Sequence, residues 1–97
     1  MANDLKVEIT EVNKHDNWVR GKYGKHSFSA KVFDDPSLWF GIKGGRVSKL
    51  FITDERQRII IQWEHQWELR PTESEYPVMQ AIVKALDEMP KSNVDAK

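Results

Sequence analysis

The chain has 97 residues, of which 39% are hydrophobic and 31% charged, a balance that excludes both a disordered chain and a membrane-embedded one. Its 15 basic and 15 acidic residues cancel, which disfavours a polybasic nucleic-acid binder. The lack of cysteine excludes disulfides and thiolate chemistry, and no apolar run approaches the ~18 residues of a membrane span. We therefore expect one cytoplasmic domain that makes no use of a membrane.

The first half of the chain alternates between apolar and polar residues, as strands with one buried face do. Alternation from residue 5 predicts a first strand, and Val12 breaks it, which predicts a bulge or a strand end near residues 10–11. Residues 18–23 and 28–32 predict a hairpin that turns at Gly24. Residues 46–53 predict another strand, with Ser48, Leu50 and Ile52 sharing one face.

Residues 58–70 form the most β-prone segment of the chain. Their alternation is consistent with one long strand, and equally with two short strands that turn at residues 64–66. In either case Trp63 and Trp67 lie an even number of residues from Ile61 and so share its face of the sheet. We therefore expect both indoles to close the core beneath a helix.

Beyond Pro71 the period changes to that of an amphipathic helix, whose apolar stripe is Met79, Ile82, Val83, Leu86 and Met89. Ser74 is the preferred N-cap because Pro77 then falls in the first turn. Thr72 with Glu75 offers an alternative capping box, which would place Pro77 deeper in the helix.

The predicted fold class is α+β: an antiparallel sheet of five to six short strands with one C-terminal amphipathic helix packed on one face. We expect a single domain over residues 1–90 and a flexible tail over residues 91–97.

No catalytic motif is present, so we expect no enzyme, no metal and no cofactor. His15, His26 and His65 lack metal-ligand spacing. The glycine-rich segment 41–46 precedes a strand, not the helix that a phosphate-binding loop requires, which favours a turn. Two other interpretations of this segment stay open. It could form a weak anion site with Lys43 and Arg46. It could also form, together with residues 64–65, the site of a small ligand-binding or enzymatic domain.

Four tryptophans in 97 residues exceed what a small core uses, and exposed tryptophan is common at interaction hot spots. The first hypothesis is therefore a non-enzymatic interaction module that binds a protein partner or a second copy of itself through a sheet face or edge. The second is a nucleic-acid-binding module that uses the basic segment between Lys14 and Lys31. The candidate interaction residues are Trp18, Arg20, Lys22, Trp39, Phe40, Lys43 and Arg46.

Four segments of the sequence, residues 18–24, 28–33, 41–50 and 67–71, carry a resemblance that extends over most of residues 17–89. They read WVRGKYG, FSAKVF, the glycine-rich stretch with RVSKL, and WELRP. In these segments the chain resembles a family of small uncharacterised proteins from Gram-positive bacteria and their phages or prophages. The resemblance implies a mobile-element context, no catalytic residues, and a turn immediately before Trp67, which favours the hairpin at residues 64–66.

Overall fold

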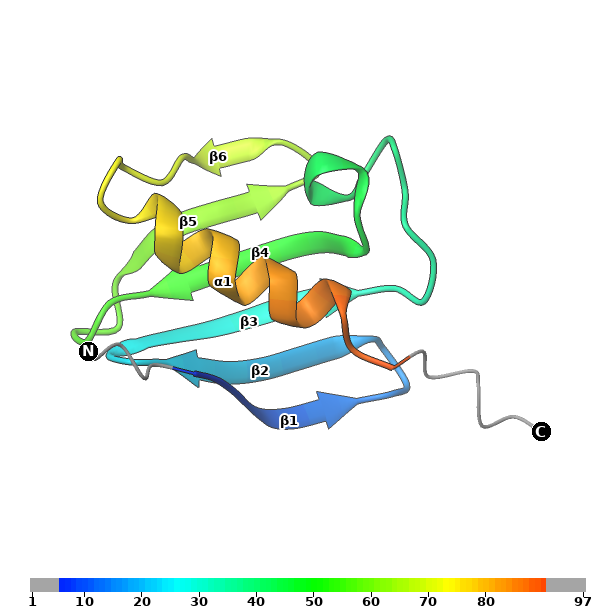
Figure 1. Ribbon diagram of the computed structural model, residues 1–97, viewed down its shortest axis with the longest axis horizontal. Helices are drawn as coiled ribbons and strands as arrows, with labels where there is room; N and C mark the ends of the chain where they lie inside the picture. The colour runs from blue at the N-terminus through cyan, green and yellow to red at the C-terminus, as the bar shows by residue number, and fades with distance from the viewer. Residues whose placement is uncertain (1–5, 91–97) are drawn as a thin grey trace.

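The computed structural model describes residues 6–90, which form a six-stranded antiparallel sheet, one short 3-10 helix and one α-helix (Figure 1). The elements are β1 (Val7–Asn13), β2 (Trp18–Tyr23), β3 (His26–Val32), η1 (Ile42–Gly44), β4 (Val47–Thr53), β5 (Ile59–Glu64), β6 (Trp67–Leu69) and α1 (Tyr76–Asp87). The predicted α+β class is confirmed. The predicted tail over residues 91–97 lies outside the described residues.

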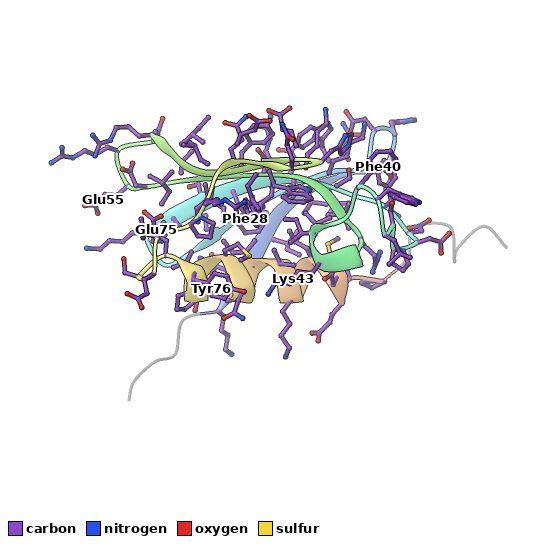
Figure 2. The ribbon with its side chains drawn as sticks, turned by 90° about the horizontal axis from the view of Figure 1, so that it is seen from above. Phe28, Phe40, Lys43, Glu55, Glu75 and Tyr76 are labelled. Carbon is purple, nitrogen blue, oxygen red and sulfur yellow. The ribbon has the colours of Figure 1, made fainter. Side chains whose placement is uncertain are left out.

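The strand order in the sheet is the chain order, β1 to β6, and each strand pairs antiparallel with the next. Helix α1 crosses one face of this meander, and the other face carries no helix from residues 6–90 (Figures 1 and 2). No helix among the described residues is long and apolar enough to cross a membrane.

The core lies between α1 and the sheet. Met79, Ile82 and Leu86 of the predicted helical stripe are fully buried, as are Leu50 and Ile61 on the strands that they cover. Burial of each such side chain contributes about 1.5–3 kcal/mol relative to exposure. The packing between the two layers therefore holds the helix, whose 12 residues are too few for stability in isolation.

The helix covers the sheet face that carries Val19, which is buried, and leaves Trp18 on the opposite face. Trp63 and Trp67 are half-buried and pack against the core with their rings edge to face, 5.0 Å between centroids. The expectation that these two indoles close the core is confirmed.

Two predicted turns and one predicted bulge can be compared directly with the structure. Gly24 has φ 61° between β2 and β3, the left-handed conformation that the hairpin needed. Segment 58–70 is two strands, and the turn between them places His65 at φ 71°. Strand β1 has its register shift between Ile9 and Glu11, where the broken alternation predicted a bulge.

Strand β1 departs from the expectation of a buried face. It is the edge strand, and only Val7 is half-buried, while Ile9 and Val12 are exposed. Helix α1 does approach β1, but among the described residues of this strand only Val7 packs against the core.

The prediction that Ser74 caps the helix is wrong. Thr72 and Glu75 instead form the reciprocal capping box: the Thr72 amide donates to Glu75 Oε1 at 2.9 Å, and the Glu75 amide donates to Thr72 Oγ1 at 3.3 Å. The box closes a separate turn over residues 72–75, and the helix begins afterwards at Tyr76. Pro77 therefore remains in the first helical turn, where its missing N–H has no cost.

Candidate functional site

The β3–β4 connection, residues 33–46, presents the most exposed apolar side chains among the described residues. Leu38 is 87% exposed, Trp39 84% and Phe40 51%. We call these three residues the apolar tip. Figure 2 shows Phe40 at one end of the sheet layer, away from α1. Side chains of this size are normally buried, so their shared exposure makes the apolar tip the candidate contact surface.

Hydrogen bonds fix the backbone that carries the apolar tip. Ser37 Oγ accepts from the amides of Trp39 at 3.3 Å and Phe40 at 3.0 Å. The Ser37 amide donates to the Gly45 carbonyl at 3.0 Å, which closes the connection at its base. At Gly41 a Cβ would lie 1.9 Å from that same Gly45 carbonyl oxygen, so only glycine fits there. The tip is thus exposed although its main chain is held.

The inner side of the tip is attached to the β5–β6 hairpin. The Phe40 ring lies 4.6 Å from the His65 ring, measured between centroids. The Trp63 indole N–H donates to the Phe40 carbonyl at 3.1 Å. Phe40 therefore anchors the tip, and Leu38 and Trp39 project furthest into solvent.

Arg46, a candidate for anion binding, is engaged within the domain. Its Nε donates to the Phe33 carbonyl at 2.7 Å, and its Nη1 donates to the carbonyls of Asp87, at 2.9 Å, and Met89. These contacts cap the carboxyl end of α1 with a positive charge, where the helix dipole favours one. The guanidinium thereby joins the β3–β4 connection to the helix.

Lys43 likewise has a partner inside the domain. Its Nζ donates to the Tyr76 hydroxyl and lies 5.1 Å from the centroid of that ring. The Lys43 backbone is left-handed, with φ 53°, within η1. The glycine-rich segment is therefore a turn, as expected, and its two cations contact different parts of α1.

Trp18, Arg20 and Lys22 lie together on the sheet face opposite α1, which we call the open face. Trp18 is half-buried against Phe51, with 6.2 Å between ring centroids. Arg20 and Lys22 are exposed, but the register places Glu11 opposite Arg20 and Glu8 opposite Lys22. Acidic side chains from β1 thus interrupt the basic segment seen in the sequence.

No group of His, Asp and Glu within residues 6–90 could hold a metal ion. Backbone hydrogen bonds, first from Arg58 and then from Arg56, lower the pKa of Asp54 below its ordinary value of 3.8. This carboxylate organises the β4–β5 turn, so its shift has a structural cause.

Leu38 was not among the candidate residues, although it is the most exposed apolar side chain in the described residues. The sequence did carry a signal: Leu38 opens the apolar run that contains Trp39, directly after the turn-forming residues 34–37. An apolar run that follows such a turn and lacks strand or helix periodicity is a candidate for exposure.

Comparisons with known proteins identify the family. The model of a domain of unknown function, DUF7678, matches residues 17–87, a span from the start of β2 to the end of α1 that leaves β1 outside. No curated protein and no solved structure shows significant similarity to the chain. Because the match covers well over half of its residues, the chain belongs to the DUF7678 family of domains of unknown function.

Proposed function

We propose that this domain is a non-enzymatic interaction module that binds a protein partner through the apolar tip. The observation that carries the proposal is the exposure of Leu38 and Trp39, 87% and 84%, on a main chain held by Ser37. Because the main chain at Trp39 is already held, binding through this residue orders little further backbone. Exposed tryptophan is also enriched among hot-spot residues.

The shape of the tip specifies what its partner must offer. Leu38 and Trp39 project outward and carry no charge, so a complementary surface must be concave and apolar. Aromatic side chains bury about 150–250 Å² each, so burial of the tip gives a small contact with one strong centre.

The test is affinity capture from a bacterial lysate treated with nuclease, using the wild-type domain and the Trp39→Ser variant as baits. We expect at least one protein that the wild type retains and Trp39→Ser loses. Ile59→Thr is the matched control, because Ile59 is also exposed and apolar but lies at the far end of β5. Identical protein sets from the wild type and Trp39→Ser would contradict the proposal.

A second candidate function is binding of single-stranded nucleic acid on the open face. The supporting observation is that Lys31 and Lys49 stand directly opposite each other on β3 and β4, beside Trp18. Glu64 faces Lys49 from β5 and offsets part of the repulsion between the lysines, and a phosphate would add a second anionic partner for the pair. Trp18 and Phe51 would supply the stacking surface.

This second function is tested by titrating mixed-sequence DNA and RNA oligonucleotides into the domain at low salt. Quenching of the tryptophan fluorescence that weakens steeply as salt rises is the expected result, because neutralising phosphates releases counterions. Lys31→Gln with Lys49→Gln would reduce the salt dependence, while Trp39→Ser would leave it unchanged. A signal insensitive to salt would rule this function out.

The resemblance to proteins of Gram-positive bacteria and their phages supports a cellular setting for the module. We place it in the cytoplasm of a bacterial host as an accessory protein of a mobile element. The lack of cysteine fits a reducing compartment.

A further inference from the structure

A cavity of 270 Å³ opens where the β1–β2 turn, the end of β3 and the segment after α1 meet, at the right of Figure 1. We call it the end cavity. Helix α1 ends at Asp87, and the chain that follows it contributes the lining on that side. The cavity reaches the core, because Val19 and Val32 of its lining are buried members of the core cluster. The apolar lining residues are Val12, Val19, Val32, Met89 and Pro90.

The β1–β2 turn supplies polar groups to the end cavity on a backbone that hydrogen bonds hold. The Val32 amide donates to the Asn17 carbonyl at 2.9 Å, which ties the turn to the end of β3. Asn13 Oδ1 accepts from the His15 amide at 3.0 Å. Because its carbonyl oxygen is used within the turn, the Asn13 side chain offers a ligand the N–H donors of its amide.

Two cationic side chains, Lys14 and Arg46, and one anionic side chain, Asp34, line the end cavity. Arg46 already donates through Nε and Nη1 to three backbone carbonyls. Asp34 is engaged in an interaction of its own. Lys14 is exposed, and none of the ion pairs within residues 6–90 involves it. A ligand in the cavity therefore meets Lys14 as its charged partner, and the complementary group is an anion.

From this lining we infer that the end cavity binds a small organic acid, whose apolar body contacts the valines of the lining and whose carboxylate pairs with Lys14 and accepts from the Asn13 amide. An apolar lining with a few polar groups is the usual composition of a small-molecule site. The volume lies below the roughly 300–1,000 Å³ of sites for drug-sized ligands, so the acid has a short chain or a single ring. The inference goes beyond the proposed function, because it uses neither the apolar tip nor the open face.

The test titrates hexanoate into the ¹³C-labelled full chain while NMR follows the methyl resonances of Val12, Val19, Val32 and Met89. Hexanamide and hexylammonium carry the same chain with a neutral and a cationic head, and they are titrated in parallel. We expect saturable shifts with hexanoate and a Kd of about 1 mM, as suits so small a ligand. Hexanamide should bind about three- to fivefold more weakly, because it lacks the ion pair with an exposed lysine, and hexylammonium more weakly still.

The length of the chain tests the apolar part of the site. Each methylene removed between hexanoate and butanoate should weaken binding about fourfold, because that much apolar surface no longer leaves water. Equal affinity for the two acids would show that the apolar lining does not take part, and it would overturn the inference.

Two exposed residues of the lining are substituted, each with a matched control. Lys14→Gln should bring the Kd for hexanoate close to that for hexanamide, while Lys25→Gln, in the β2–β3 turn at the other end of β2, should leave it unchanged. Val12→Ser should weaken binding of all three six-carbon probes about threefold. Ile9→Ser is its control, because Ile9 is an exposed apolar residue of the same strand outside the cavity. Thermal melting checks that all four variants fold.

No saturable shift at about 20 mM hexanoate, equal binding of hexanamide, or stronger binding of hexylammonium each overturns the inference. So does an equal effect of Lys14→Gln and Lys25→Gln, which would mean that the acid responds only to the overall charge. If nuclear Overhauser effects connect the cavity methyls to residues 91–97 in the free chain and hexanoate does not bind, the cavity holds its own chain and the inference is wrong. None of these results depends on Trp39, so this site and the proposed function can fail separately.

Discussion

Arg46 donates two hydrogen bonds to Asp87: the Arg46 amide donates to Asp87 Oδ1 at 2.8 Å, and the Arg46 guanidinium donates to the Asp87 carbonyl at 2.9 Å. This pair joins the start of β4 to the end of α1 across 41 residues of chain. Gly45 has no side chain at this contact, where a Cβ would lie 2.8 Å from the Asp87 carboxylate. Arg46 therefore holds the carboxyl end of the helix through both its amide and its guanidinium.

Replacing Arg46 by alanine should lower the free energy of unfolding by about 2–3 kcal/mol, because three backbone carbonyls lose a charged donor. Urea denaturation measures the change. Arg20→Ala is the matched control, since its exposed side chain on the open face should contribute less than about 0.5 kcal/mol. Equal losses in the two variants would show that Arg46 does not hold the helix end.

The capping box before α1 predicts different effects for two neighbouring hydroxyls. Thr72→Ala should cost about 1 kcal/mol, because the Glu75 amide loses its side-chain acceptor. Ser74→Ala should cost less, because the Ser74 hydroxyl contacts only the Thr72 hydroxyl, at 3.3 Å, in an exposed position. Thermal unfolding of both variants makes the comparison, and a larger loss for Ser74→Ala would restore Ser74 as the cap.

Gly41→Ala should destabilise the β3–β4 connection, because its Cβ would lie 1.9 Å from the backbone oxygen of Gly45. Backbone atoms cannot yield as side chains do, so we expect a loss of at least about 1–3 kcal/mol. Hydrogen exchange should also accelerate at the amides of Trp39 and Phe40, which Ser37 now protects. Unchanged exchange at these two amides would show that the tip is not held by its base.

The lowered pKa of Asp54 predicts that its contribution to the stability of the domain depends on pH. Its pKa in the folded domain lies below the ordinary 3.8, so its contribution is fully present above about pH 3.8 and is lost as pH falls through the lower folded value. The difference in Tm between the wild type and Asp54→Ala should be constant from pH 7 to about pH 5 and shrink below pH 3.8. Asp54→Asn keeps an oxygen acceptor for the Arg56 and Arg58 amides, so it should lower Tm less. A Tm difference that grows in acid would reverse the sign of this effect.

Local patterns predicted the parts of this fold whose causes are local. The strand over residues 46–53 and its buried residues Ser48, Leu50 and Ile52 follow from alternation, because side-chain parity is a property of a few consecutive residues. The helical stripe from Met79 to Leu86 follows for the same reason.

The remaining features depend on contacts that are distant in sequence. The alternation of residues 18–23 shows that Trp18 and Val19 lie on opposite faces of the sheet. It does not show which face is buried, because that depends on where α1 packs. Arg46 was predicted as a candidate anion-binding residue because two of the carbonyls that accept its hydrogen bonds lie 41 and 43 residues away in the sequence. The exposure of Trp39 depends on the connection around it, where no period applies.

The order of elements along the chain has a consequence during synthesis. Each strand pairs with the one made immediately before it, so the sheet can assemble hairpin by hairpin as the ribosome releases it. Its cover, α1, is made after every strand. At about 5–20 residues per second, the roughly 30 residues between β4 and the end of α1 take a few seconds to emerge. During that time Leu50 and Ile52 face the solvent, and the nascent chain is a substrate for chaperones until its helix arrives.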